Sequence, residues 1–424
     1  MKILYIHQYF TTREGNLGTR SFEFAKHFVR KGHDVTVLTG DAYLPPLAGE
    51  RQGRFTRTGT IDGVRIIAVK HAYSNYMGYF RRVLAFLLFL FHSFWIALFL
   101  RRPDLVLATS TPLTVAIVAL SLKWLKGVPF VFEVRDLWPE APIQVGAIRS
   151  PWLIGGLRFL ERLTYRQAVS VVGLSPGMVE GILQTGTPAQ KVAMIPNCSD
   201  LDLFLAPADT RVELAQLRRR FGLSDQLVVL HGGAMGIANG LDYVVRAAIL
   251  LQQWGEQDIC FLFAGDGKMK PQLELMCQQH GLTNLIFTGP VPRKEMPLYL
   301  SICNLTITSF LPLPIFATNS PNKFFDSLAA GKPVIVNSAG WTKEIVESER
   351  IGFYVNPTDP AELAALLQSL KSDKETLAAM GLRARRLAEE RFERGKLADQ
   401  MERVLVAAYE QGRSIDAKGR IYAK

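Results

Sequence analysis

The fold class is decided by two stretches of sequence, ILYIHQYFTTREGNLGTR at residues 3–20 and LVVLHGGAMGIANGL at residues 227–241. Each begins with a short apolar run, passes through a glycine-bearing loop and reaches a helical pattern, at Thr19–Arg30 and at Leu241–Gln253. A strand, a glycine loop and a helix in this order are typical of the first unit of a parallel α/β sheet. Because this order opens each half of the chain, the sequence predicts two such sheets.

Shorter apolar runs continue the alternation of strand and helix through both halves. We predict two doubly wound α/β domains, residues 1–200 and 213–392, with a hinge between Asn197 and Val212, where Asp, Pro and Thr concentrate. Residues 393–424 form a C-terminal helix and tail that we expect to pack back on the first domain. We predict later strands at Asp34–Leu38, Leu105–Ala108, Phe130–Phe132, Val169–Gly173, Ile259–Ala264, Leu285–Phe287, Leu305–Thr308 and Val334–Val336, and late helices at Ala361–Ser369, Lys374–Arg391 and Gly395–Glu410, with a frayed tail after Gln411.

Charge is distributed unevenly along the 424 residues. Residues 1–200 carry 23 Lys and Arg against 13 Asp and Glu, whereas the remainder carries 26 against 25. Between Gly63 and Phe132 the only acidic residue is Asp104. Such a basic field attracts anionic lipid headgroups, phosphates or nucleic acid. We expect no nucleic-acid partner, because the chain has no zinc-ligand spacing and no basic helix with interleaved aromatic residues.

The four cysteines are scattered, without the spacing of a metal site or a redox pair. Only four apolar residues lie between Lys2 and His7, which is too short for the core of a signal peptide. We therefore expect reduced thiols in a cytosolic protein.

An apolar segment without charge occupies Val83–Leu100, between the pairs Arg81-Arg82 and Arg101-Arg102. As a helix it would be about 27 Å long at about 1.5 Å per residue, which is marginal for crossing a bilayer. Three interpretations stay open: a spanning helix, a buried helix, and a monotopic helix that lies on or dips into the membrane. The flanking arginines and the basic surroundings favour the monotopic interpretation.

The loop after the first strand holds the first group of candidate ligand-binding residues. Strand, loop and helix start place backbone amides at the carboxyl edge of a sheet, where α/β proteins bind ligands. The spacing of the loop glycines is neither that of a dinucleotide-binding motif nor that of a P-loop, which argues against a nicotinamide enzyme and an ATPase. A flexible loop without a ligand is the alternative. The candidates are His7, Gly15, Asn16, Gly18 and Arg20.

A second group follows the strand at Phe130–Phe132, where charged residues stand among apolar neighbours. Charged groups at the end of a buried strand must pair with each other or meet a ligand, because burying a bare charge is costly. Glu133, Arg135 and Asp136 are therefore candidates for a site. An ion pair between Arg135 and one of the carboxylates is the structural alternative.

Glycine turns follow the predicted strands of the second half. Glycines let the backbone approach a ligand closely, and three such turns on one sheet edge are a stronger signal than any single turn. The candidates in these turns are Gly232, Gly233, Gly265, Gly267 and Arg293.

Residues 318–333, TNSPNKFFDSLAAGKP, read as a short helix with its caps. We predict Ser320 as N-cap, Pro321 at the first helical position and Gly331 just past the end. Lys323 lies in the first turn, where the helix amides and dipole favour an anion, and Asp326 shares its face. A cation for phosphate and a carboxylate for hydroxyls suggest a nucleotide-sugar site, and a capped surface helix is the alternative.

These motifs together resemble the family 4 glycosyltransferases, retaining enzymes of the GT-B fold, and in particular the bacterial branch that builds capsule, O-antigen or exopolysaccharide. The resemblance covers nearly the whole chain. It rests on the Gly15–Gly18 loop with residues 30–35, on Phe132–Glu140, on the glycine turns at 232–241, 263–267 and 289–293, and on Pro321–Pro333. It implies an acceptor-binding first domain and a donor-binding second domain that face each other across a cleft.

The resemblance also implies roles for individual residues. Asp326 matches the carboxylate that holds the ribose diol, and Thr318 stands where many relatives have a glutamate that contacts the donor sugar. Lys323 becomes the leading cation for the diphosphate, with Arg20 as a second. The active-site histidine of many relatives aligns with Arg135, so Glu133, Arg135 and Asp136 would orient the acceptor or the donor sugar. Asn319, Ser320 and Asn322 complete the expected donor set.

The implied reaction transfers a hexosyl or N-acetylhexosaminyl group from an NDP-sugar, UDP-type by expectation, with retained anomeric configuration and without a metal or other cofactor. The implied acceptor is a polyprenyl-diphosphate-linked saccharide at the anionic inner leaflet, which makes the protein cytoplasmic and membrane-associated. Two alternatives are an NDP-sugar 2-epimerase of the same fold and a non-catalytic, membrane-associated scaffold.

Overall fold

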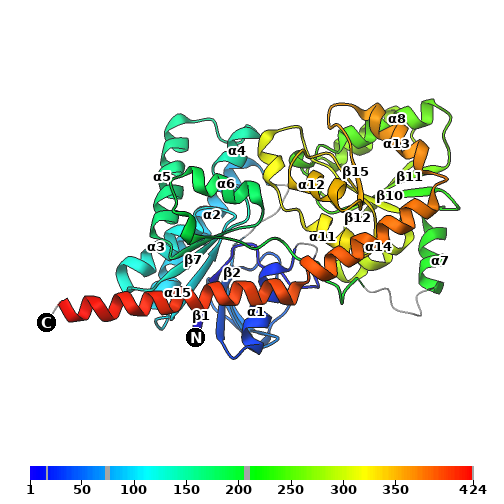
Figure 1. Cartoon of the computed structure of the whole chain (residues 1–424). Coiled ribbons are helices and arrows are strands. Elements are labelled where there is room, and N and C mark those ends of the chain that lie inside the picture. Colours follow the sequence, from blue (N-terminus) through cyan, green and yellow to red (C-terminus); the bar gives the residue numbers. More distant parts are fainter. Residues whose placement is uncertain (16–17, 72–76, 205–210, 423–424) are drawn as a thin grey trace. The chain divides into compact units, whose positions relative to one another are not determined.

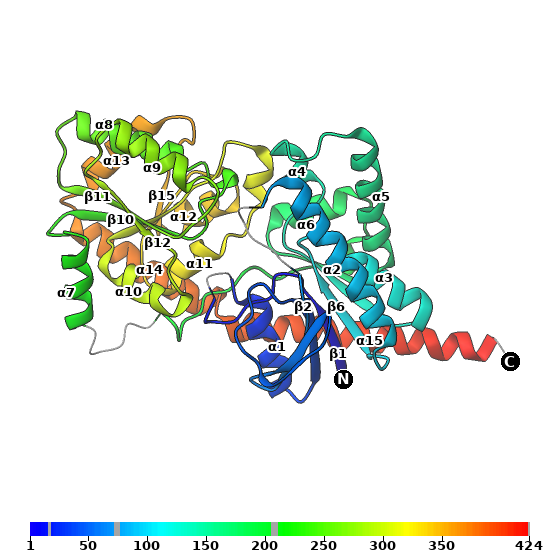
Figure 2. The same ribbon diagram turned by 180° about the vertical axis from the view of Figure 1, so that it is seen from behind.

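The computed structural model describes residues 1–15, 18–71, 77–204 and 211–422. The chain divides into two compact units, Met1–Pro196 with Gly395–Lys424, and Asn197–Arg394. Each unit is built on one mostly or wholly parallel sheet with helices packed against it (Figure 1; Figure 2). The predicted fold class, with two doubly wound α/β domains and a helical C-terminus, is confirmed.

The first unit contains a nine-stranded sheet in the order β3-β4-β5-β2-β1-β6-β7-β8-β9. Among the strands that the structure describes in this sheet, only the pairings of β3 with β4 and of β4 with β5 are antiparallel. The central strands are buried on both faces, which explains why they are apolar runs rather than alternating patterns. The strands are β1 (Lys2–Ile6), β2 (Asp34–Gly40), β3 (Ala48–Gln52), β4 (Thr56–Ile61), β5 (Val64–Val69), β6 (Leu105–Thr109), β7 (Phe130–Val134), β8 (Ser170–Gly173) and β9 (Val192–Met194).

The helices of the first unit, apart from the C-terminal helix, lie in the chain between the strands of its sheet. They are α1 (Arg20–Arg30), α2 (Tyr79–Phe99), α3 (Val115–Lys126), α4 (Glu140–Gln144), α5 (Pro151–Gln167), α6 (Pro176–Gln184) and the 3₁₀ turn η1 (Ala189–Lys191).

The second unit contains a six-stranded parallel sheet in the order β12-β11-β10-β13-β14-β15. Successive side chains of its central strands enter two different cores: Val229 and Phe261 pack on one face, and Val228 and Leu262 on the other. Its elements are α7 (Arg211–Arg220), β10 (Leu227–Gly232), η2 (Ile237–Asn239), α8 (Asp242–Gln253), β11 (Ile259–Ala264), α9 (Lys270–Gln279), β12 (Leu285–Gly289), η3 (Arg293–Glu295), α10 (Met296–Ile302), β13 (Leu305–Thr308), η4 (Pro314–Thr318), α11 (Asn322–Ala329), β14 (Val334–Val336), α12 (Trp341–Ser348), β15 (Gly352–Tyr354), α13 (Pro360–Leu370) and α14 (Lys374–Arg391).

The apolar segment Val83–Leu100 is helical as far as Phe99, the last residue of α2. The two sides of this helix differ in burial. One side, with Ala85, Phe89, Ser93 and Ala97 at four-residue intervals, is buried. The opposite side is apolar and open to solvent, with Phe80, Leu84, Leu87, Leu88, Phe91, Trp95 and Phe99 all exposed. Figure 2 shows α2 lying along the first unit beside α3.

Helix α11 matches the predicted helix in its core-facing side but not in its start. Phe324, Phe325 and Leu328 are fully buried, and Gly331 follows the helix with φ +62°, as predicted. The predicted N-cap at Ser320 is wrong, because Pro321 is the capping position and no side chain caps the helix. Ser320 Oγ instead accepts a hydrogen bond from the backbone amide of Asn197 at 3.2 Å.

The C-terminal helix α15 (Arg394–Tyr422) is longer than predicted. Fraying was expected after Gln411, but the helix continues through Ser414, whose hydroxyl donates to Glu410 O at 3.1 Å. Its contacts with α1 are described below.

Candidate functional site

The carboxyl edge of the second sheet is formed by three interlocked turns. Gly233 N donates to Ala264 O at 2.8 Å, Met235 N to Asp266 O at 2.9 Å, and Gly265 N to Gly289 O at 2.9 Å. The turns after β10, β11 and β12 therefore bond to one another. The three glycine turns that the sequence singled out form one continuous backbone surface.

Glycine is required where these turns meet. A Cβ atom on Gly265 would lie 1.8 Å from Gly233 O, and one on Gly267 would lie 2.6 Å from Met235 O. Gly233 itself has φ +135°, a conformation that residues with a side chain rarely adopt. The glycines thus allow the loops to pack. Gly265 and Gly267 are buried where the turns meet, and Gly233 stays partly exposed at the sheet edge.

Lys323 from the first turn of α11 lies against this edge. Its Nζ donates to Asn239 Oδ1 at 2.7 Å and lies 5.7 Å from the centre of the Phe310 ring. A Cβ atom on Gly233 would be 3.7 Å from Lys323 Cε. Burial lowers the pKa of Lys323 to about 7. Among the residues that the structure describes, no carboxylate pairs with Lys323, so no internal anion competes with a ligand for this side chain.

The start of α11 adds backbone donors beside this lysine. Phe324 is the first residue of the helix whose amide bonds to a carbonyl of this segment, Pro321 O, at 3.1 Å. The amides of Asn322 and Lys323 precede the first intrahelical bond. Together with the Lys323 side chain, they form the kind of helix terminus that binds phosphate.

Asp326 lies one turn further along α11 and is fixed by Arg293. The guanidinium donates from Nη1 to Oδ2 at 3.0 Å and from Nη2 to Oδ1 at 2.8 Å. Burial opposes the charge of Arg293, but Asp326 outweighs it and the pKa of Arg293 is raised. Each carboxylate oxygen keeps a second lone pair, so Asp326 is oriented and can still accept a hydroxyl. The sequence predicted both residues for the donor site but not their pairing.

The segment before α11 is held by hydrogen bonds within the unit. Thr318 Oγ1 donates to Ile315 O at 2.7 Å, and Trp341 Nε1 donates to Asn319 O at 2.6 Å. Asn197 engages Ser320 through both its backbone and its side chain. The polar groups of this segment thus shape the approach to α11.

His231 and Phe310 are two residues of this edge that sequence reasoning did not single out. His231 is fully buried, and its Nδ1 has no partner among the described residues. Burial and the charge of Lys323 hold the pKa of His231 well below its usual range. Phe310 stacks on Phe316 with ring centres 5.4 Å apart. The signal available in the sequence was position: His231 lies near the carboxyl end of β10, and Phe310 comes two residues after β13.

The carboxyl edge of the first sheet brings His7 and Arg135 together. Arg135 Nη1 lies 3.5 Å from His7 Nε2. A guanidinium only donates, so Nε2 accepts and the proton of the neutral imidazole lies on Nδ1. Burial and Arg135 hold the pKa of His7 well below its usual range. Nδ1 is buried and has no partner in the described part of the chain, which leaves a donor available at this edge.

Asp136 and Ser110 complete this edge. Thr111 Oγ1 donates to Asp136 Oδ2 at 2.8 Å, and the Arg135 backbone amide donates to Ser110 Oγ at 3.0 Å. Burial raises the pKa of Asp136, although Thr111 and Arg135 oppose the shift. The ion pair between Arg135 and a carboxylate, which the sequence left open, is absent among the described residues. Arg135 therefore carries its charge at the edge without a carboxylate partner.

Arg20 and Glu133, both candidates for a ligand site, form a buried ion pair with each other. Arg20 Nε donates to Glu133 Oε1 at 2.9 Å, and its other nitrogens donate to Ile195 O and Pro196 O. Thr109 donates to the second oxygen of Glu133 at 2.7 Å. Both charged side chains are at most 1% exposed. Glu133 and Arg20 are thus bonded within the unit, and solvent hardly reaches either side chain.

The loop before α1 is only partly described. Gly15 N donates to Thr12 O at 3.1 Å, which makes a tight turn. Gly18 lies shortly before the helix, and the predicted candidate Asn16 lies outside the described residues.

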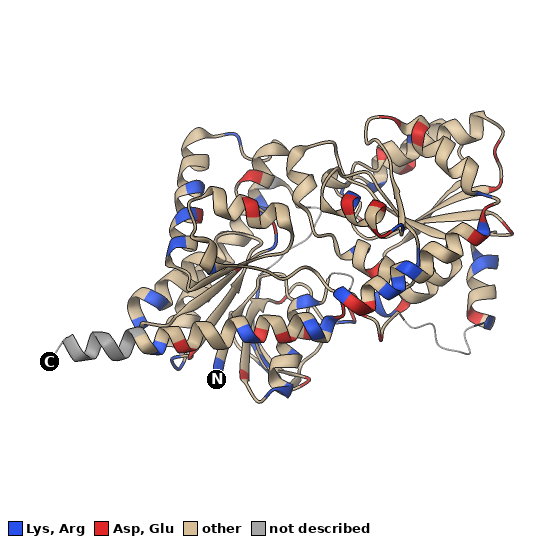
Figure 3. Cartoon of the chain, viewed as in Figure 1, with Lys and Arg blue, Asp and Glu red and all other residues tan. Residues whose placement is uncertain are grey.

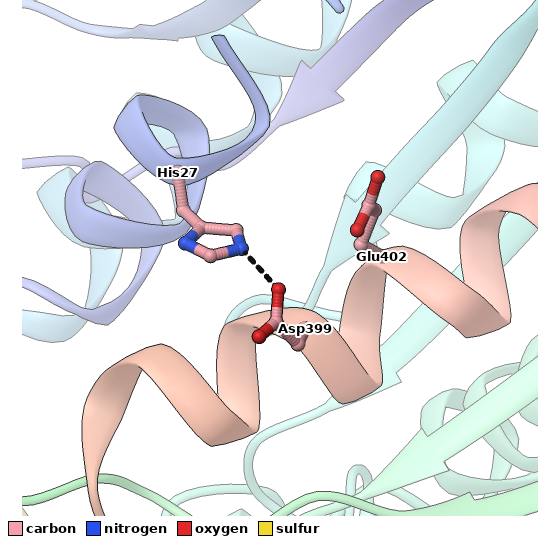
Figure 4. Close-up of side chains that lie close together, drawn as sticks. All are labelled: His27, Asp399 and Glu402. Atoms are coloured by element: carbon pink, nitrogen blue, oxygen red, sulfur yellow. Dashed lines mark hydrogen bonds and ion pairs between the residues drawn. The ribbon is translucent and has the colours of Figure 1, made fainter. Parts of the chain in front are cut away.

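One group of side chains has the composition of a metal site but is bonded internally. His27 Nε2 lies 2.8 Å from Asp399 Oδ1 (Figure 4). Lys31 Nζ lies 2.9 Å from the same oxygen. Glu402 bonds to His33 at 3.1 Å. A lysine ammonium on the shared oxygen opposes a metal cation. The group joins α15 to α1.

Two family descriptions match the chain. Residues 15–198 match the Glycosyl transferase 4-like domain, and residues 215–387 match the Glycosyl transferases group 1.

Individual proteins that resemble the chain agree with these matches. The putative colanic acid biosynthesis glycosyl transferase WcaI of Escherichia coli is 24% identical over 81% of this chain and 84% of its own length. The α-D-kanosaminyltransferase of Streptomyces kanamyceticus is 26% identical over 58% of this chain, and the match spans 62% of that relative. HepE of Anabaena, solved in complex with UDP-glucose, has a TM-score of 0.71 at 19% identity and covers 96% of this chain and 100% of its own.

Proposed function

The chain belongs to the family 4 glycosyltransferases of the GT-B fold, and we propose that it moves a sugar from an NDP-sugar to a lipid-linked saccharide in the synthesis of a cell-surface polysaccharide. The observation that carries the proposal is Lys323, which has no carboxylate partner among the described residues and lies beside the partly exposed turn at Gly233 and the first amides of α11. This arrangement fits a diphosphate.

The proposed donor is a UDP-sugar carrying a hexosyl or N-acetylhexosaminyl group. Asp326, held in place by Arg293, is suited to accept the ribose hydroxyls. HepE, whose fold this chain shares, is known in complex with UDP-glucose, which supports a uridine nucleotide. Thr318, Asn319, Ser320 and Asn322 would shape the sugar and phosphate side of the pocket.

The proposed chemistry retains the anomeric configuration and uses fixed donors rather than a metal. Lys323 and the α11 amides would stabilise the charge that develops on the leaving diphosphate. The leaving phosphate would then accept the proton of the acceptor hydroxyl. Arg135, Asp136 and the Nδ1 proton of His7 would orient the acceptor or the donor sugar. Glu133 and Arg20 would act as positioning residues.

The proposed acceptor is attached to a polyprenyl diphosphate, and helix α2 supports this. Phe80–Phe99 is long and apolar enough to cross a membrane by length and composition, with only 22% of its window buried. Because Ala85, Phe89, Ser93 and Ala97 pack inward along its whole length, we propose that α2 lies on the membrane rather than spanning it. An apolar groove of about 500 Å³, lined by Leu87, Leu88, Leu90, Phe91, Phe94 and Ile117, is suited to an isoprenoid chain.

Two features connect this surface to the proposed site and to the membrane. Tyr9, in the loop after β1, contacts Phe86 of α2 with ring centres 6.4 Å apart, so α2 begins near the carboxyl edge of its sheet. Figure 3 shows lysine and arginine positions along α5, whose Trp152 and Phe159 are exposed. A basic, apolar face fits the anionic inner leaflet, so we propose a cytoplasmic protein bound to the inner membrane.

The test is incubation of the purified chain with radiolabelled UDP-sugars and a bacterial membrane extract, followed by separation of lipid and aqueous fractions. Transfer places the label in the lipid fraction. A new NDP-sugar in the aqueous fraction, without label in lipid, would instead identify an epimerase. If no donor is consumed and no labelled product appears in either fraction, the proposal of an enzyme is contradicted. The non-catalytic scaffold would then be the remaining interpretation.

A further inference from the structure

A large pocket lies at the amino edge of the first sheet, where β1, β2 and β5 begin. Its volume is about 760 Å³, and the β3–β4 hairpin and the end of α2 close its sides. The strands that end at His7 and near Arg135 run away from it, so it is separate from the proposed acceptor edge. The function proposed above makes no use of this pocket.

The pocket is strongly basic. Its lining includes Lys2, Arg51, Arg65 and Arg101 against a single carboxylate, Asp34. Arg65 forms an ion pair with Asp34. No carboxylate within the described ranges forms an ion pair with the other three cations. Thr36, Thr58 and Thr60 also line the pocket. The Thr60 hydroxyl donates to Ala48 O at 3.4 Å, and the hydroxyls of Thr36 and Thr58 are of the kind that can donate to an anion.

Its rim is apolar on the side of α2. Leu100 lines the pocket, and the preceding Phe99 is 80% exposed. Trp95 stacks on Phe99 with ring centres 6.1 Å apart, which continues the exposed apolar side of α2 up to the pocket. A ligand that fills this region would combine an acidic head with an apolar chain.

A lysine bonds to the last carbonyls of α2, beside the pocket. A helix C-terminus carries partial negative charge that would repel a phosphate. Here Lys126 Nζ donates to Leu100 O at 2.8 Å and lies 3.5 Å from Ala97 O. The positive charge of Lys126 offsets the partial negative charge of these two carbonyls, so the helix end does not cancel the positive charge of the pocket.

We propose that this pocket binds the phosphate headgroup of an anionic phospholipid, whose acyl chains leave along the exposed side of α2. The proposal rests on the membrane contact of α2 proposed above but not on sugar transfer. It gives the first unit a specific lipid contact at the far end of α2 from the acceptor edge. Binding there would fix the orientation of the first unit on the membrane surface.

The test is titration calorimetry of the full chain with dihexanoyl phosphatidylglycerol below its critical micelle concentration. We expect one saturable site. In the double variant Arg51→Gln/Arg101→Gln affinity falls by roughly 25-fold, taking about fivefold for each cation near a lipid phosphate. The control Arg30→Gln/Arg219→Gln removes two exposed arginines outside the pocket, and its affinity stays within about twofold of wild type.

Four results would overturn the proposal. Equal binding of dihexanoyl phosphatidylcholine would show that the chains alone suffice, and equal binding of glycerol phosphate would show a site for free phosphate. Competition by UDP would assign the pocket to the nucleotide. If the pocket variant binds the lipid as tightly as wild type does and has the same melting temperature, Arg51 and Arg101 do not contact the ligand. No outcome depends on sugar transfer, so failure here leaves the proposed function standing.

Discussion

At the scale of single residues, the surroundings of the Lys323 side chain give the clearest indication of an anionic ligand. Its burial lowers its pKa to about 7, so near neutral pH the ammonium is only partly charged in the free protein. A bound diphosphate favours the charged form and raises the pKa again. Binding of the donor is therefore coupled to proton uptake at this side chain.

We predict that UDP affinity falls as pH rises from 7.5 to 9. In this range the free lysine is mostly neutral while the bound lysine is charged, so each pH unit weakens binding by up to about tenfold. Calorimetry in buffers of different ionisation enthalpy would show the proton uptake directly. The variant Lys323→Arg keeps its charge throughout and should bind with an affinity that changes little with pH. A wild-type affinity that is constant over this range would contradict the assignment.

The pair of Arg20 and Glu133 leads to a different expectation. Replacing Glu133 by Gln leaves Arg20 buried without its counter-ion, which should lower the free energy of unfolding by about 3 kcal/mol or more. Thermal or denaturant unfolding would measure this loss. Glu180→Gln, at an exposed position of α6, serves as the matched control and should change stability by less than about 0.5 kcal/mol. A Glu133→Gln protein of wild-type stability but without activity would return Glu133 to a direct catalytic role.

At the scale of elements, α2 combines a buried side that attaches it to the domain with an exposed side that consists mainly of apolar residues. Exposed apolar surface of this extent marks an interaction site. Because the buried side continues along the whole helix, a spanning arrangement would require the helix to leave its core.

We predict that Phe91→Ser/Trp95→Ser lowers binding to vesicles of mixed phosphatidylglycerol and phosphatidylcholine by at least about tenfold, because two aromatic side chains no longer enter the interface. Vesicle flotation measures the bound fraction. Both residues are exposed, so the melting temperature should not fall. The control Leu275→Ser/Leu382→Ser changes two exposed helical residues of the second unit and should leave flotation unchanged. Equal loss in both variants would show that the effect is not specific to α2.

At the scale of the whole molecule, the parallel strands were predictable because they are buried on both faces and therefore appear as apolar runs. Ile259–Ala264, Leu305–Thr308 and Val334–Val336 match the observed strands at both ends. The strands β3 and β4 were missed because their AGERQ and TRTGTI sequences are polar, and β3 is the edge strand of its sheet. β5 was missed as well, although its VRIIAV sequence is apolar.

The site was predictable where residues follow strands or begin a helix, and less so where distant residues meet. The glycine turns and Lys323 could be found from local sequence. The pairing of Asp326 with Arg293 and of Arg20 with Glu133 joins segments 33 and 113 residues apart, and no local pattern specifies such contacts. Ser320 failed as an N-cap for the same reason, since Asn197 occupies its hydroxyl.

The central claim is that the start of α11 holds the donor diphosphate, and UDP titration at pH 7 of the full chain tests it most directly. Wild type should bind one UDP, and Lys323→Met should bind at least about tenfold more weakly through loss of a charge-assisted contact. Lys332→Met removes the same charge just beyond the other end of α11, where Lys332 donates to Cys303 O at 2.7 Å, and should bind like wild type. If Lys323→Met, folded as judged by its melting temperature, binds UDP as tightly as wild type does, the claim is contradicted.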